Sequence, residues 1–216
     1  MKRINFYVDG YNFYYGLRSL KETDRTWKKF YWLDIVKLFE QFINNQSQQL
    51  QKVYYFSASP IAQDESNRQR ILFKANELIN GSRFEVIKGF FVEKNVTCKV
   101  CNAPYKVAVE KRTDVNIAVQ MVGDCALNNV DAIVLVSADS DLLAPLQFIT
   151  LHYPHIKIKI YFPPGNNSSA LTDFARKNKI KLVRLENSKQ RFINSVLPDI
   201  VSKDGMTYTI PPKWKV

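Results

Sequence analysis

Short apolar runs and helix-like patterns alternate along this chain. Runs rich in β-branched and aromatic residues predict strands, and apolar residues spaced three or four apart predict amphipathic helices. The strands or extended segments are predicted at residues 4–8, 53–57, 84–92, 107–110, 132–137, 157–162 and 180–185. The helices are predicted at residues 11–20, 32–43, 64–79, 113–127, 141–151, 168–178 and 192–197. Such alternation predicts a three-layer α/β/α fold with a mainly parallel central sheet.

The remaining segments are predicted to be irregular. They comprise a basic connector at 21–31, a polar loop at 44–49, an interruption at 95–105, a loop at 163–167, and a tail over 203–216 with a turn at Asp204-Gly205 before a short strand. Asn80-Gly81 is suited to end a helix, and Ser168 or Ser169 to begin one. A length of 216 residues fits one α/β domain better than two. We therefore expect one domain over 1–186, with 187–216 forming a C-terminal helix and tail that pack on it.

Acidic residues follow two of the predicted strands. The first strand leads into Asp9, with Asn12 three residues later, and a later strand leads to Asp139 and Asp141. Asp114 stands at the start of another predicted helix. Strand-to-helix junctions of an open α/β sheet lie at its carboxyl edge, where ligands bind. The pattern therefore predicts that these side chains gather at one edge.

Each acid also has a simpler explanation in helix capping. Asp9 and Asp139 are suited to N-cap positions, Asp141 to a first helical turn, and Thr113 or Asp114 to the start of its helix. Capping explains each acid singly but not why several gather at one edge. Two carboxylates about 4 Å apart repel by roughly 4 kcal/mol at an effective dielectric of 20. One or two Mg²⁺ or Mn²⁺ ions would offset that repulsion, activate water and hold a phosphodiester.

Several other chemistries find no support in the sequence. The two histidines, His152 and His155, fall near the end of a late helix, so a histidine acid–base pair is not expected. Phosphate-binding loops of the Gly-x-x-x-x-Gly-Lys and Gly-x-Gly-x-x-Gly types are absent, as is a Gly-x-Ser-x-Gly elbow. A haloacid-dehalogenase type phosphatase needs Asp-x-Asp after its first strand, and Asp9-Gly10-Tyr11 supplies only the first member.

The charge balance suggests a polyanionic partner. Lysine and arginine number 31 against 20 acidic residues, for a net charge of +11. Two basic groups are candidates for RNA contacts: Lys106, Lys111 and Arg112 ahead of Asp114, and Arg25, Lys28 and Lys29 among Trp27, Tyr31 and Trp32. Cations mixed with aromatic rings suit single-stranded RNA. Ordinary surface charge and a core role for Trp32 are the alternatives.

The cysteines leave two states open. Cys98-x-x-Cys101 has the spacing of half a structural zinc site, which needs four ligands. Cys125 is expected inside a helix in the core. The pair is then either two reduced thiols on a hairpin or half a zinc site that the same pair of a second subunit completes in a homodimer.

Targeting signals are not evident. Apolar stretches fall short of the ~20 residues that a transmembrane helix needs, and the apolar run near the start is too short for a signal peptide. Three cysteines do not make a disulfide framework. A cytoplasmic protein without a membrane partner is therefore expected.

The acidic motifs resemble those of the NYN domain family, a branch of the PIN-like nucleases. The resemblance rests on Phe6-Tyr7-Val8-Asp9-Gly10-Tyr11-Asn12, Glu110-Lys111-Arg112-Thr113-Asp114-Val115 and Leu135-Val136-Ser137-Ala138-Asp139-Ser140-Asp141-Leu142. The chain end, with Leu197-Pro198-Asp199 and Pro211-Pro212-Lys213-Trp214, is similar to the tail of LabA-like bacterial members. One departure is Arg112, which stands where the family often has glycine.

This resemblance implies a PIN-like (Rossmann-like) fold and a metal-dependent ribonuclease site. It places Asp9, Asn12, Asp114, Asp139 and Asp141 in that site, and makes neighbours of the two strands that precede the acidic pairs. The hypothesis is an endoribonuclease that uses metal-activated water, with the four aspartates as ligands. The alternative is a non-catalytic RNA-binding module that keeps the NYN fold.

Overall fold

A six-stranded, all-parallel sheet forms the centre of the molecule. The computed structural model describes residues 1–215, and the strand order is β3-β2-β1-β6-β7-β8. The strands are β1 (Lys2–Asp9), β2 (Gln48–Ser57), β3 (Phe84–Lys88), β6 (Ala132–Val136), β7 (Lys157–Phe162) and β8 (Lys181–Arg184). Every neighbouring pair in this sheet is parallel, and β1 lies beside β6.

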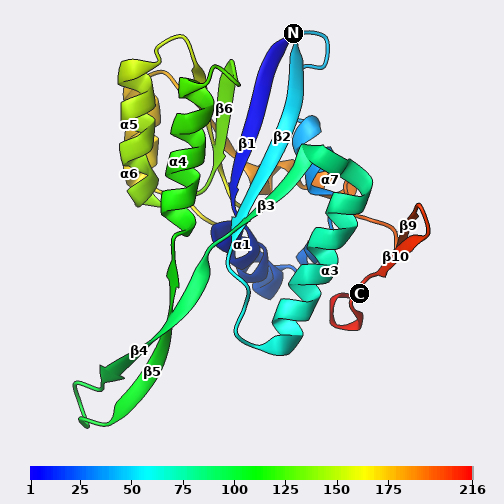
Figure 1. Ribbon diagram of the computed structural model, residues 1–216, viewed down its shortest axis with the longest axis vertical. Helices are drawn as coiled ribbons and strands as arrows, with labels where there is room; N and C mark the ends of the chain where they lie inside the picture. Colours follow the sequence, from blue (N-terminus) through cyan, green and yellow to red (C-terminus); the bar gives the residue numbers. More distant parts are fainter. Residues whose placement is uncertain (216) are drawn as a thin grey trace.

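Helices cover both faces of the sheet (Figure 1), which confirms the predicted three-layer α/β/α, PIN-like fold. One face carries α4 (Thr113–Ala126), α5 (Leu143–His152) and α6 (Ser169–Lys177), and the other carries α1 (Gly10–Thr23), α2 (Ile35–Glu40), α3 (Gln63–Asn80) and α7 (Lys189–Ile193). Short 3-10 helices are η1 (Arg25–Tyr31), η2 (Gly81–Arg83), η3 (Ser140–Leu142), η4 (Leu185–Ser188) and η5 (Pro212–Trp214). Within residues 1–215, no helix combines the length and the hydropathy needed to cross a bilayer.

Each face of the sheet has its own apolar core. Successive side chains of a strand point to opposite faces, so Phe6 packs towards α2 and stacks on Phe39 at 4.7 Å, while Tyr7 belongs to the core on the other face. The C-terminal part of the chain also contributes to the first core, through Phe192, Leu197, Val201, Ile210 and Trp214.

A two-stranded antiparallel arm projects from the body (Figure 1). It consists of β4 (Phe90–Thr97) and β5 (Pro104–Lys111), and the two strands form a sheet of their own. The predicted extended segment 84–92 therefore contains two strands, and much of the predicted interruption 95–105 is strand. The predicted strand at 107–110 is present, but it belongs to β5 of the arm and not to the central sheet.

Gly89 lies between β3 and the arm, at a position that has no room for a side chain. A Cβ atom there would lie 2.5 Å from Thr113 Oγ1 and 2.6 Å from the Lys111 carbonyl oxygen. Gly10 is likewise required by crowding, since its Cβ would lie 2.4 Å from a Tyr55 ring carbon. The start of α1 and the start of α4, which carry the candidate acids, are thus packed closely against their neighbours.

The predicted connector at 21–31 is helical instead. The helix α1 continues to Thr23, and η1 follows with Trp27, Phe30 and Tyr31 buried. These rings lie three and four residues apart, so one side of η1 faces the core and its cations face outward. The structure therefore makes the aromatic residues of this segment part of the core.

Other predicted boundaries shift by a few residues. The strand β2 begins at Gln48 inside the predicted loop 44–49, because it pairs with β1 from Lys2 onwards. The helix α2 is shorter than 32–43, and α7 precedes most of 192–197. Gly81 with φ of 55° and Ser168 with its bond from the Leu171 N–H confirm the two predicted caps.

The tail contains a small hairpin. Asp204-Gly205 joins β9 (Ile200–Lys203) to β10 (Met206–Thr209), which confirms the predicted turn and the strand after it. The last residue of the predicted tail, Val216, lies outside the described residues.

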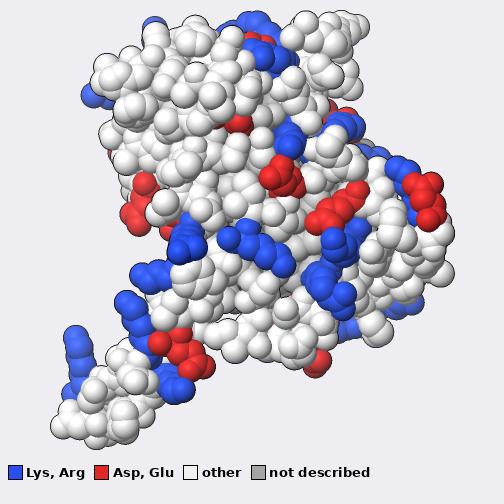
Figure 2. Space-filling view, in the orientation of Figure 1, with Lys and Arg blue, Asp and Glu red and all other residues white. Residues whose placement is uncertain are grey.

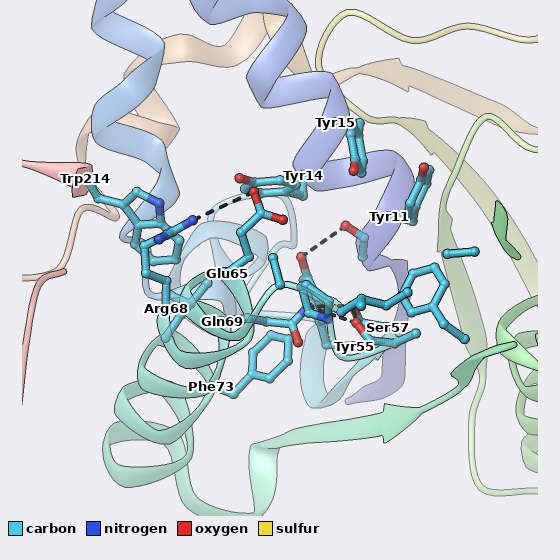
Figure 3. A pocket seen from close by; sticks show the side chains of 18 residues that line it. Tyr11, Tyr14, Tyr15, Tyr55, Ser57, Glu65, Arg68, Gln69, Phe73 and Trp214 are labelled. Atoms are coloured by element: carbon cyan, nitrogen blue, oxygen red, sulfur yellow. Dashed lines mark hydrogen bonds and ion pairs between the residues drawn. The ribbon is translucent and has the colours of Figure 1, made fainter. Parts of the chain in front are cut away.

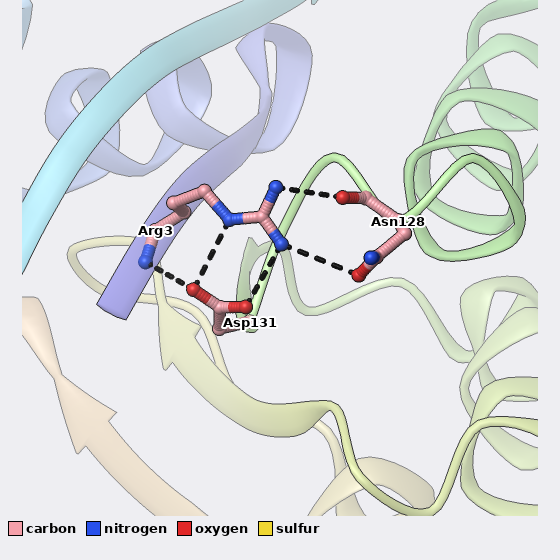
Figure 4. A network of polar contacts seen from close by, with 3 residues as sticks. All are labelled: Arg3, Asn128 and Asp131. Carbon is pink, nitrogen blue, oxygen red and sulfur yellow. Dashed lines mark hydrogen bonds and ion pairs between the residues drawn. The ribbon is translucent and has the colours of Figure 1, made fainter. Parts of the chain in front are cut away.

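A polar clamp fixes the amino ends of β1 and β6 (Figure 4). The backbone N–H, Nε and Nη2 of Arg3 donate to the Asp131 carboxylate, and Nη1 donates to the Asn128 carbonyl oxygen at 2.7 Å. The Arg3 bonds hold the pKa of Asp131 at about 2. Because the two parallel strands are held in register at this end, the acidic residues that follow them lie side by side at the other end.

Candidate metal centre

Asp9 is the buried anchor of the acidic edge. It is only 2% exposed, and its Oδ1 accepts the backbone N–H of Asn12 at 3.0 Å, which makes it the N-cap of α1. Its Oδ2 accepts the side-chain amide of Asn12 at 2.7 Å. Burial raises the pKa of Asp9, the bonds from Asn12 and Ser137 oppose that rise, and the charge of Asp139 adds to it.

Ser137 connects the two acidic pairs. Its hydroxyl donates to Asp9 Oδ2 at 2.8 Å and accepts the backbone N–H of Asp139 at 3.0 Å. Asp139 Oδ1 in turn accepts the backbone N–H of Asp141 at 2.9 Å, which caps η3. Residues 9 and 139 are therefore joined through one hydroxyl group at the carboxyl edge of β1 and β6.

Asp114 joins this group from the first turn of α4. Desolvation, followed by repulsion from Asp139, Asp9 and Asp141 in that order, raises the pKa of Asp114 to about 6. Its side chain remains open to solvent. The structure thus brings the four predicted aspartates together, although the strand that precedes Asp114, β5, belongs to the arm and not to the central sheet.

The carboxylates fit a metal ion that keeps part of its water shell better than an ion ligated by protein alone. Among residues 1–215, no three His, Cys, Asp or Glu side chains are arranged so that they could hold a metal ion directly. Mg²⁺ usually keeps several waters and uses one or two protein carboxylates. In the same range, the carboxylates of Asp114 and Asp141 receive no protein hydrogen bond, so their oxygens are available to such an ion.

A pocket lined by aromatic side chains opens beside the acidic edge (Figure 3). It has a volume of about 260 Å³ and lies between α1, the loop after β2, α3 and the base of the arm. Tyr11 and Tyr15 stand at one side with ring centroids 4.3 Å apart and are 46% and 41% exposed. Gly10, which follows Asp9, also lines it, so the pocket and the carboxylates share a wall.

The far side of the pocket is more polar. Glu65 and Arg68 approach within 3.8 Å of each other, and Gln69 donates to Ser57 Oγ at 3.0 Å. Phe91 and other residues complete the lining from the arm. A planar ring could therefore rest on tyrosine while its polar edge meets charged and amide groups.

Basic side chains follow the arm and continue where it joins the body (Figure 2). Lys106 pairs with Glu93 at 2.9 Å on the arm. Lys111 is exposed, and the guanidinium of Arg112 lies 4.8 Å from the centre of the Phe90 ring. Arg112 adopts φ of 75°, the left-handed region that favours glycine, which accounts for the glycine common at this position in the family that the motif resembles.

The second basic group lies on η1, which packs against α1 and η5. Arg25, Lys28 and Lys29 point away from buried Trp27, and the Lys28 Nζ donates to the Lys215 carbonyl oxygen at 2.6 Å. These cations belong to a different part of the surface from the arm. Base stacking on Trp27 is excluded, because that ring is 5% exposed.

Two residues of the site escaped the sequence analysis. Ser137 was taken as the end of a strand, although its place two residues before Asp139 is a usable signal. Asn166 donates from its side chain to the Asn12 carbonyl oxygen at 2.9 Å and ties the loop before α6 to the start of α1. No local pattern predicts that second contact, because it spans most of the chain.

Comparisons with known proteins identify the family of this chain. The NYN domain profile matches residues 3–182. NYN domains are in general nuclease-like hydrolases that depend on divalent metals and interact with RNA. A crystal structure of a protein of unknown function from Vibrio parahaemolyticus superposes with a TM-score of 0.53 at 19% identity, covering 85% of this chain and 93% of that one.

A curated relative carries a different activity in its name. The 6-hydroxy-3-succinoylpyridine 3-monooxygenase HspA of Pseudomonas putida is 30% identical over 227 residues, covering 89% of this chain and 67% of the relative. The profile match spans most of the chain and includes the segments with Asp9, Asp114 and Asp139. The chain therefore belongs to the NYN domain family.

Proposed function

We propose that this protein is a metal-dependent endoribonuclease that hydrolyses RNA phosphodiester bonds. The observation that carries the proposal is the convergence of four aspartates at one sheet edge, two of which, Asp9 and Asp139, are linked through the Ser137 hydroxyl. Binding a polyanion gains nothing from carboxylates so close together. A site that recruits a divalent cation to a phosphodiester does gain from them.

The roles of the residues follow from their contacts. Asp114, Asp139 and Asp141 would hold one or two hydrated Mg²⁺ or Mn²⁺ ions, in part through bound water, with Asp9 behind them. When bound, such ions supply charge stabilisation and a lowered pKa of water. Asn12 fixes the Asp9 carboxylate through both its backbone and its side chain.

The substrate is proposed to be single-stranded. A base next to the scissile phosphate would enter the pocket beside Gly10 and stack on Tyr11 or Tyr15, which requires it to be unpaired. Lys111 and Arg112 stand just ahead of Asp114, where they would meet the neighbouring phosphates and neutralise negative charge that develops during cleavage. Lys106, already paired with Glu93, and the η1 cations Arg25, Lys28 and Lys29 would contact the backbone further along.

The test compares cleavage of a labelled single-stranded RNA by the wild type and by Asp139→Asn, each with Mn²⁺ and with a chelator. Asp173→Asn, in a surface pair on α6, is the matched control. We expect cleavage only with metal, and loss of cleavage only in Asp139→Asn. Equal cleavage by both variants and the wild type would reject the proposal. Tight, salt-sensitive RNA binding without turnover under any metal would favour the RNA-binding module instead.

A second candidate is oxidation of a small nitrogen heteroaromatic acid. It is favoured by the name of the Pseudomonas putida relative together with a pocket of about 260 Å³ that could hold one ring. Monooxygenation consumes O₂ and a two-electron reductant, so the assay follows reduced nicotinamide and O₂ in the presence of 6-hydroxy-3-succinoylpyridine, with and without added flavin. Substrate-dependent consumption of both, abolished by Tyr11→Ala and retained in Asp139→Asn, would establish this activity over the nuclease.

A further inference from the structure

The tip of the arm is a tight loop built around two cysteines. Beyond the last paired residues of β4 and β5, the Cys98 N–H donates to the Ala103 carbonyl oxygen and the Asn102 N–H donates to the Cys98 carbonyl oxygen, both at 2.9 Å. Asn102 adopts φ of 55° and turns the chain back. The loop thus brings both thiols to the far end of the arm, where Cys101 is exposed and Cys98 partly so.

The loop also favours negative sulfur. The backbone N–H groups of Cys101 and Val100, followed by the Cys101 side chain, lower the pKa of the Cys98 thiol. A Cys-x-x-Cys loop of this form supplies two ligands of a tetrahedral Cys₄ zinc site. Within residues 1–215, a third ligand is missing from its surroundings.

One face of the arm is largely apolar and open to solvent, with Lys94 between Val92 and Val96. Opposed residues of an antiparallel pair share a face, and the register places Val92 opposite Val109 and Val96 opposite Tyr105. Val92, Val96 and Tyr105 are 38%, 36% and 51% exposed. The other face carries the Glu93–Lys106 pair.

An arm of this kind is incomplete as it stands. A two-stranded hairpin is marginally stable alone in water. This one projects from the body (Figure 1), and Val92, Val96 and Tyr105 on it are exposed. One partner could supply both the two missing thiolate ligands and the cover for the exposed face. A second copy of the chain, related by a two-fold axis, supplies both the same cysteine pair and the same apolar face.

We propose that two copies of this protein associate through their arms, and that Cys98 and Cys101 of each copy bind one shared Zn²⁺. Each thiol loses its proton to solvent when it binds. The apolar faces of the two arms pack beside the metal. The proposal stands independently of the nuclease assignment, because neither the acidic edge nor RNA takes part in it.

The experiment measures metal content and mass on the same sample. Protein produced with added Zn²⁺ and kept reduced is passed through a desalting column, then examined by plasma mass spectrometry and by light scattering. We expect half a zinc per chain and a particle of twice the 25.1 kDa chain mass. The double variant Cys98→Ser with Cys101→Ser should lose the zinc and become monomeric, whereas Cys125→Ala, in the core, should keep both.

Two further measurements separate the parts of the proposal. Substitution by Co²⁺ should give the sulfur-to-cobalt charge-transfer intensity of four thiolates per metal. Val96→Glu keeps the thiols but places charge on the apolar face, and should shift the dimer towards monomer with zinc bound more weakly. Circular dichroism shows that each variant is folded.

Three results would overturn the proposal. The first is one zinc per chain in a monomer, which would mean that ligands come from the same copy. The second is a reduced protein that takes up no zinc at stoichiometric concentration. The third is a dimer that persists unchanged in the double cysteine variant, which would place the interface elsewhere.

Discussion

Replacing Asp114 by asparagine should make the protein more stable at neutral pH. The fold holds this carboxyl in a negative and partly desolvated environment that raises its pKa from 3.8 to about 6. The unfolded chain ionises it more readily than the folded one. Ionisation therefore penalises folding, and asparagine removes the penalty while it keeps the shape of the side chain.

The size of the effect follows from the shift in pKa. A rise from 3.8 to about 6 corresponds to at most roughly 3 kcal/mol at about 1.4 kcal/mol for each pH unit. Because the side chain is open to solvent, screening reduces this figure. We expect Asp114→Asn to gain about 1–2 kcal/mol in free energy of unfolding at neutral pH and above.

The gain should have a defined pH dependence. A group with a raised folded-state pKa imposes no penalty below its unfolded value of 3.8 and its full penalty above about 6. The difference between Asp114→Asn and the wild type should therefore be near zero at about pH 4, grow between the two pKa values, and stay level above the higher one. Urea unfolding at several pH values measures it, with Asp173→Asn as a surface control.

A divalent metal should reverse part of this difference. If Mg²⁺ or Mn²⁺ binds the folded protein near Asp114, saturating metal stabilises the wild type by mass action and stabilises the variant less. A variant that is less stable than the wild type at pH about 8, or a gain that is the same at pH about 4, would refute the electrostatic reasoning behind the site.

Three other substitutions probe the scaffold of the site. Gly89→Ala should lower the free energy of unfolding by about 1–3 kcal/mol, because its Cβ would lie 2.5 Å from Thr113 Oγ1; an unchanged urea midpoint would contradict this. Arg112→Gly should raise stability by up to about 1 kcal/mol, since relief of about 1–2 kcal/mol of left-handed strain exceeds the added chain entropy of about 0.4–1 kcal/mol; a loss in thermal unfolding would contradict it. Ser137→Ala should cost about 1–3 kcal/mol and raise the pKa of Asp9 further, because a bond to that carboxylate disappears; a metal requirement and stability like those of the wild type would show that the hydroxyl link is dispensable.

The central sheet was predictable because its strands are buried on both faces. Residues of β6 and the end of β1 are almost all buried, so they form continuous apolar runs whose ends are sharply marked by polar residues. The acids that follow were placed at the correct edge for this reason. The hairpin turn near Cys98 and Cys101 was expected, but the arm as a separate sheet was not, because an alternating strand pattern does not say which sheet the strand joins. Gly89 was a further local sign of a break.

The prediction for residues 21–31 was wrong for a different reason. Its lysines and arginines made it read as a polar connector, yet Trp27, Phe30 and Tyr31 recur at helical spacing and are buried. The helical spacing of the aromatic residues was visible in the sequence, but the basic composition of the segment was given more weight. The place of Ser137 before Asp139 was a local signal, but its bond to Asp9 depends on the distance between β1 and β6, which local sequence does not contain.

The capping explanation of the acids is compatible with the proposed metal site, because the carboxylates differ in how many of their oxygens the protein occupies. Asp9 accepts three hydrogen bonds and is almost fully buried, so its contribution is to hold the start of α1 and, through Ser137, the backbone of Asp139. Asp139 gives one oxygen to a cap and keeps the other. Asp114 caps nothing and has the raised pKa that crowded charge produces. Positioning thus falls to the inner carboxylate, and in the proposed site the outer carboxylates would attract the cation.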